Sequence, residues 1–127
     1  MDIRMSLQLS IAERLTRARG DLRMGVPVIL CGPGGAALVA SVEALDAGRL
    51  ADLRGFGPPV LAITARRAET LKARAYDGDL ARILPPATAD LGWLRSVADP
   101  ADDLRAPMTG PLTSAREGAA DRHRAAL

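Results

Sequence analysis

Apolar residues near the N-terminus recur at helical spacing. Ser10 and Glu13 stand at the separation of a capping box, in which each side chain pairs with the other residue's backbone N–H. The stripe that follows has the 4-3-4 period of a helix: Ile11, Leu15, Ala18 and Leu22. Gly25 stands where a glycine usually ends a helix. The pattern predicts a first helix from residue 10 to residue 25.

Further along the chain, short continuous apolar runs alternate with helical segments. The runs "VPVIL" (26–30) and "VLAIT" (60–64) predict buried strands, and "LARIL" (80–84) is a third strand candidate. The segment 36–41, "AALVAS", fits either a second strand or the start of a helix. Residues 42–55 have a helical composition, and Gly48 marks a point where such a helix can break.

Two more helices are expected in the second half of the chain. Thr64 can cap a helix over 65–75, and Thr88 or Asp90 can cap a helix over 91–98. Alternating strands and helices with short connections favour an α/β (α+β) fold, with a mixed sheet layered with helices. We expect a single α/β domain over residues 1–105, followed by an irregular segment and the start of a linker helix over 106–127.

Composition narrows the classes of partner. The net charge of 127 residues is +2, with positive and negative side chains interspersed, so nothing favours nucleic acid or a membrane surface. The longest uncharged stretch, 26–42, is interrupted by Gly and Pro and is too short to span a membrane. The N-terminus has no long apolar run followed by a cleavage site. We therefore expect a cytoplasmic location.

Few residues are candidates for chemistry. Cys31 is the single cysteine, which excludes a disulfide within the chain, and its apolar neighbours predict a buried small hydrophobe. His123, between two arginines, is expected to be a solvated surface residue. Asp102 and Asp103 have no neighbouring ligands that would complete a metal site. Trp93 is expected to anchor the core or an interface. No catalytic residue and no metal ligand is assigned.

The turn "GPGG" (32–35) leaves a cofactor alternative open. Gly32 and Gly34 fit the first two positions of the dinucleotide fingerprint, whose third position falls on Ala37. Arg66 and Arg67 follow the strand candidate 60–64 and could bind the 2′-phosphate of NADP, although they lie further from the glycines than is usual. A structural turn between two strands is the interpretation that we favour.

Three segments together carry a family resemblance: "DLRMGVPVIL", "VLAITARRAETLKARAYDGDLARILPP" and "DLGWLRSVADPADDL". From about residue 12 to residue 112 the chain resembles the N-terminal region of bacterial GTP cyclohydrolase II proteins of riboflavin biosynthesis. That region is similar to a degenerate dihydroxybutanone phosphate synthase. The resemblance implies the synthase scaffold, with the acidic metal-binding loop replaced by "CGPGGAA" (31–37), which has no Asp or Glu.

The resemblance also sets expectations about activity and partners. GTP cyclohydrolase II holds its zinc with three cysteines in a separate catalytic domain, and one cysteine cannot build that site. We therefore expect a non-catalytic chain with no cofactor of its own. Its expected partners are the catalytic domain of the parent protein and a second copy in a homodimer. The alternatives are a small NADP-binding domain and a stand-alone interaction protein.

Overall fold

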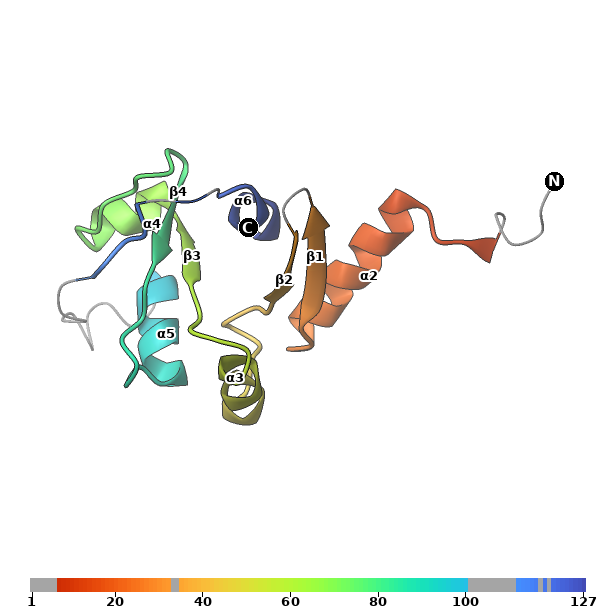
Figure 1. Cartoon of the computed structure of the whole chain (residues 1–127), viewed down its shortest axis with the longest axis horizontal. Helices are drawn as coiled ribbons and strands as arrows, with labels where there is room; N and C mark the ends of the chain where they lie inside the picture. Colours follow the sequence, from red (N-terminus) through yellow and green to blue (C-terminus); the bar gives the residue numbers. More distant parts are fainter. Residues whose placement is uncertain (1–6, 33–34, 101–111, 117, 119) are drawn as a thin grey trace.

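The computed structural model describes residues 7–32, 35–100, 112–116, 118 and 120–127, and all elements given below lie within these ranges. Figure 1 shows the chain as an α/β arrangement in which a helix and a hairpin extend to one side of a larger helix–sheet unit. No helix of the described residues is long and apolar enough to cross a membrane.

The first helix, α2 (Ile11–Arg23), starts as its sequence predicts. The Ser10 hydroxyl accepts from the Glu13 N–H at 3.1 Å, and the Glu13 carboxylate accepts from the Ser10 N–H at 2.9 Å. The hydrogen bond from the Ser10 backbone N–H is the main cause that lowers the pKa of Glu13 below its usual range, and the hydrogen bond with the Ser10 side chain lowers it further. After the helix, Gly25 has φ 79°, and a Cβ there would collide with the Ala44 carbonyl.

An antiparallel hairpin follows, formed by β1 (Val28–Gly32) and β2 (Gly35–Val39). Its register pairs Gly32 with Gly35, so the glycine cluster joins two strands of one sheet. The prediction of a structural turn is confirmed, and the ambiguous segment after it is a strand.

The next helix, α3 (Ala47–Arg54), is shorter than its composition predicts. Asp46 has an extended backbone, and its carboxylate accepts from the Arg49 N–H at 2.7 Å, which makes it the N-cap. Residues 42–44 form a turn before it. The expectation of a helix from residue 42 is wrong, because the extended backbone of the capping residue Asp46 interrupts any helix that starts before it.

The larger unit contains β3 (Leu61–Thr64), α4 (Ala65–Thr70) and β4 (Leu80–Ile83). The two strands pair antiparallel, Leu61 opposite Ile83. On the other side of β4, residues 112–116 approach in an extended form: the Leu84 N–H donates to the Thr113 carbonyl at 2.8 Å, and the Ala115 N–H to the Arg82 carbonyl at 2.7 Å. β4 therefore has backbone partners on both sides and is buried along its whole length.

Two helices complete the fold, α5 (Leu91–Ala98) and α6 (Asp121–Ala126). Asp90, and not Thr88, caps α5 by accepting from the Trp93 N–H at 2.8 Å. Helix α6 contacts β1, and Figure 1 shows it between the hairpin and the larger unit. Its Arg124 forms an ion pair with Asp79, which precedes β4, at 2.8 Å.

The core lies between the β3–β4 pair and helices α3, α4 and α5. Its buried members are Leu45, Leu50, Leu61, Ile63, Ala68, Ala81, Ile83, Leu94 and Val97. Within the described residues the strands form two separate two-stranded antiparallel sheets. The expected single mixed sheet is therefore wrong, whereas the α/β class is confirmed. The described residues of the hairpin contribute no fully buried side chain to this core.

Candidate functional site

The glycine turn does not have the setting that dinucleotide binding requires. The fingerprint places a helix N-terminus directly after the glycines, so that backbone N–H groups point at the pyrophosphate. Here Gly35 begins strand β2, whose N–H groups belong to an antiparallel ladder with β1. Gly32 ends β1, and Gly34 lies outside the described residues. A hairpin therefore stands where the fingerprint would need a phosphate-binding turn that leads into a helix.

The two arginines of the cofactor alternative point in different directions. Arg66 is exposed, whereas Arg67 is 8% exposed. The Arg67 guanidinium donates from Nε to the Val97 carbonyl at 2.7 Å, and from Nη2 to the carbonyls of Ser96 at 3.0 Å and Asp99 at 3.3 Å. These carbonyls are at the C-terminal end of α5, where a cation is favourable. Arg67 is therefore committed to holding α5 against α4.

An open apolar groove lies among the described residues. Its volume is about 1250 Å³. β2 and β3 contribute to its walls, with residues from α3 and the end of α6. Most of the lining side chains are aliphatic, and its charged lining residues within the described ranges are Glu43 and Arg67. The groove suits an apolar occupant better than an anion.

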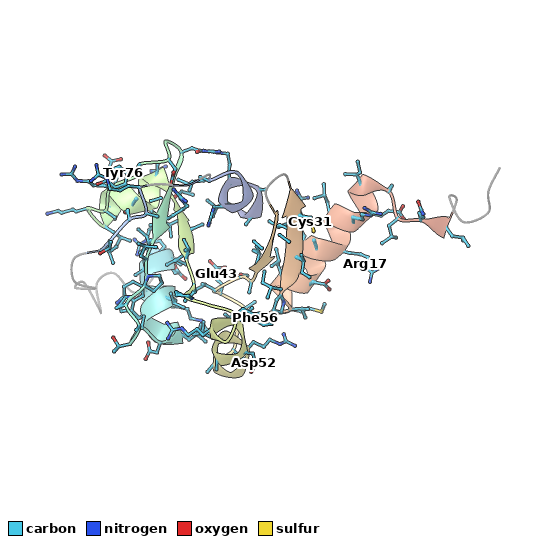
Figure 2. The ribbon with its side chains drawn as sticks, viewed as in Figure 1. Arg17, Cys31, Glu43, Asp52, Phe56 and Tyr76 are labelled. Atoms are coloured by element: carbon cyan, nitrogen blue, oxygen red, sulfur yellow. The ribbon has the colours of Figure 1, made fainter. Side chains whose placement is uncertain are left out.

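The hairpin presents one covered face and one exposed face to its surroundings. Residues directly opposite in an antiparallel pair share a face. One face, made by Val28, Leu30, Ala37 and Val39, is half-buried. The other, which we name the exposed hairpin face, is formed by Ile29, Cys31, Ala36 and Leu38. Figure 2 places Cys31 on this hairpin.

This result corrects two expectations. The run 26–30 was expected to be a buried strand and Cys31 a buried hydrophobe, but Cys31 is exposed and Ile29 is 64% exposed. The reason is the topology. A continuous apolar run is typical of a strand covered on both faces, and within the described residues this hairpin has no second layer on one of them.

A second uncovered apolar surface runs along α2. Of its 13 residues, all described, none is buried. Ala18 and Leu22, at the end nearest the hairpin, are half-buried, while Leu15 is 53% and Ile11 79% exposed. Leu7, which precedes the helix, is also 79% exposed. The stripe is thus partly covered at one end and open at the other.

The remaining candidates have structural settings. Trp93 is half-buried and packs against the core beside Leu94 and Val97. His123 is half-buried at the edge of the groove, which corrects the expectation of a fully solvated side chain. Asp102 and Asp103 lie outside the described residues. Among the residues that are described, no three His, Cys, Asp or Glu side chains gather as a metal site would require.

Sequence reasoning missed two arginine networks. Arg82, buried in β4, donates to both carboxylate oxygens of Asp77 at 2.9 and 3.1 Å and to the Gly118 carbonyl at 3.2 Å. Arg95 of α5 donates to the carbonyls of Val42 at 3.2 Å and Leu45 at 2.7 Å, which ties the turn before α3 to the core. Their positions in the sequence look like ordinary solvated charges, so no local signal could have found them.

On an exposed surface, the hydrogen bond from Arg124 lowers the pKa of Asp79. Nε of Arg124 donates to the two carboxylate oxygens at 2.9 and 3.0 Å, and Nη2 donates to the Asp77 carbonyl at 3.1 Å. This contact fastens α6 to the turn that leads into β4.

Comparison with known proteins found no match: no protein family, no curated protein and no solved structure corresponds to this chain.

Proposed function

We propose that the chain is a non-catalytic accessory domain of a GTP cyclohydrolase II, built on a degenerate dihydroxybutanone phosphate synthase scaffold. Two of the three segments that carry the resemblance lie in the unit that holds the hydrophobic core. The longest of them, 60–86, contains β3, α4 and β4, and the next contains α5. Because these two segments fold into one packed unit, their position supports the proposal that the scaffold is retained for its fold.

The hairpin supports the loss of synthase chemistry. In the synthase the corresponding loop is acidic and binds metal and substrate. Here the described residues around the turn are Cys31, Gly32, Gly35 and Ala36, none of which is a carboxylate. The groove beside the hairpin has mostly aliphatic walls. Such walls are suited to covering by protein, because burying aliphatic surface is favourable and non-directional.

The observation that carries the proposed role is the uncovered stripe of α2. A helix with an apolar stripe gains most of its stability in a protein by burying that stripe. Ile11 and Leu15 remain 79% and 53% exposed. The accessory role therefore consists in contacts outside the chain, either with the catalytic domain of the parent enzyme or with a second copy.

The first test is enzymatic. The purified chain is expected to turn over neither GTP nor ribulose 5-phosphate when metal is supplied, and turnover above the blank would overturn the proposal. The parent reading frame is expected to encode a three-cysteine zinc motif downstream of Leu127. A stop codon there would instead favour a stand-alone interaction protein.

The second test concerns the α2 stripe in the parent enzyme. Ile11→Asp with Leu15→Asp should lower the stability or assembly of the enzyme, because two charges enter a contact surface. Arg14→Asp with Arg17→Asp, on the same helix and outside the stripe, is the matched control. Equal effects of the two pairs would count against a contact role for the stripe. Saturable NADP binding by the chain, weakened by Arg66→Ala, would revive the cofactor alternative.

A further inference from the structure

The segment between α4 and β4 alternates in burial along its length. Its odd-numbered residues are half-buried and pack against the core: Leu71, Ala73 and Ala75. Its even-numbered residues are exposed: Lys72, Arg74 and Tyr76. The Ala73 N–H donates to the Ala68 carbonyl at 2.8 Å, which fixes the segment against α4. The fold therefore holds two cations and one aromatic ring in a row on its surface.

Arg116 adds a third cation to this row. Its guanidinium carbon lies 4.9 Å from the centroid of the Tyr76 ring, in a cation–π contact. Arg116 is exposed, and Tyr76 is 41% exposed. The adjacent Ala115 N–H donates to the Arg82 carbonyl at 2.7 Å, so β4 positions this arginine beside the segment 71–76. We name four residues the cationic strip: Lys72, Arg74, Tyr76 and Arg116.

The carboxylates that follow the strip in the sequence are engaged elsewhere. Asp77 forms an ion pair with Arg82 at 2.9 Å, and Asp79 forms one with Arg124 at 2.8 Å. Across the ranges that the structure describes, no ion pair involves a residue of the cationic strip. The whole-chain charge of +2 does not reveal this surface, because the fold decides which carboxylates are already paired.

A row of negative charges that also carries flat rings matches the chemistry of this surface. Proteins that bind single-stranded nucleic acid without reading its sequence combine cations along the phosphates with aromatic rings or arginine planes on which bases stack. The strip supplies the cations in Lys72 and Arg74 and the planes in the stacked pair of Tyr76 and Arg116. An acidic protein surface would use the cations but not the planes. A membrane would need apolar side chains to insert, and Tyr76 is the one ring of the strip.

We propose that the cationic strip binds single-stranded nucleic acid through its phosphates and a stacked base, without reading its sequence. This activity goes beyond the accessory role proposed above and uses a different surface. Figure 1 shows α4 and α2 on opposite sides of the molecule, and Figure 2 shows Tyr76 at the end remote from Arg17 of α2. Because the strip has three cations, binding is weak and depends on salt.

Fluorescence anisotropy of a labelled oligo(dT) measures binding to the purified chain, with oligo(U) of the same length as the RNA arm. A length of about 12 nucleotides lies within the roughly 4–16 nucleotides that one such site covers. We expect saturable binding of both, with a Kd of about 100 μM or below at about 50 mM salt. Each neutralised phosphate adds about −0.7 to the slope of log K against log salt, so three cations predict a slope of about −2 and an about 20-fold loss between about 50 and 200 mM salt.

Variants locate the binding surface. Lys72→Gln with Arg74→Gln removes two of the three cations and should weaken binding at least about tenfold, with a slope near −0.7. Arg14→Gln with Arg17→Gln removes the same charge from exposed positions on α2 and is the matched control, with a change within about twofold. Tyr76→Ala should weaken binding at least about fivefold, whereas Tyr76→Phe keeps the ring and should bind like the wild-type chain. Circular dichroism checks that the variants fold, and the salt slope of the wild-type chain needs no variant.

Each outcome bears on the proposal. It is overturned if neither oligonucleotide binds saturably up to about 300 μM chain at about 50 mM salt. It is also overturned if the control pair on α2 weakens binding as much as the strip pair, because the charge of the whole chain would then be responsible. Duplex DNA, polyglutamate or phosphatidylserine vesicles that bind as tightly as the single strand overturn it as well, since none of them offers an unpaired base to stack. Equal binding of polyglutamate would point to an acidic protein partner. The accessory role is tested separately, by the downstream zinc motif and the turnover assays.

Discussion

Arg67 is the side chain whose replacement tests the packing of the larger unit most directly. It is 8% exposed, and its guanidinium donates to three carbonyls at the end of α5. Arg67→Met keeps much of the apolar stem and removes all donors. The carbonyls of Val97, Ser96 and Asp99 would then lose the hydrogen bonds that they accept from the Arg67 guanidinium.

The expected magnitude follows from the two shorter bonds, at 2.7 and 3.0 Å. Hydrogen bonds to charged groups contribute about 1.5–3 kcal/mol each. Because the variant no longer has a guanidinium group to desolvate on folding, the desolvation cost that is removed offsets part of this loss. We expect Arg67→Met to lower the free energy of unfolding by about 3 kcal/mol, a large fraction of the 5–15 kcal/mol that is typical of a domain.

Urea unfolding followed by circular dichroism measures this difference. Arg66→Met is the matched control, because Arg66 is the exposed neighbour on the same helix, and its change should stay within about 0.5 kcal/mol. If Arg67→Met costs less than about 1 kcal/mol, the bonds to α5 do not stabilise the fold as argued. A variant that keeps its stability but loses NADP binding would instead favour the cofactor alternative.

Three further predictions concern other parts of the chain. Gly25→Ala should destabilise the fold by more than about 1 kcal/mol, because φ at Gly25 is 79° and a Cβ there would meet the Ala44 carbonyl. Gly20→Ala, inside α2 with free space around it, should instead stabilise the fold by about 0.5–1 kcal/mol. The urea midpoints of the two variants should therefore move in opposite directions. Trp93→Ala should cost about 2–3 kcal/mol, less than the roughly 3–5 kcal/mol of a fully buried Trp, since Trp93 is half-buried; an unchanged melting temperature would contradict its packing against the core. Arg124→Gln should raise the pKa of Asp79 toward its ordinary value of 3.8, measured by NMR titration of the carboxyl group. Because the pKa of Asp79 is lowered in the folded chain, the contact favours folding above the unfolded pKa and is lost as the pH falls through the folded value, so the variant should lose this part of the acid dependence.

Local features were predictable because they depend on short stretches of sequence. The capping box of Ser10 and Glu13 and the cap by Thr64 each close hydrogen bonds within a few residues, and the hairpin register pairs Gly32 with the nearby Gly35. Such bonds form in much the same way wherever the segment lies. The sequence by itself therefore determined most elements and the α/β class. It failed for the start of α3, where Asp46 caps a helix that composition alone extends to residue 42.

What covers each element was decided only by the tertiary structure. The apolar run of β1 has the same composition as a buried strand, yet Ile29 and Cys31 are exposed, because burial depends on which layers the chain brings over it. Arg66 and Arg67 are adjacent and identical in chemistry, but one is exposed and the other holds α5 through carbonyls about 30 residues away. Contacts at such separations are set by how the helices pack on β3 and β4, and no local pattern in the sequence encodes that packing.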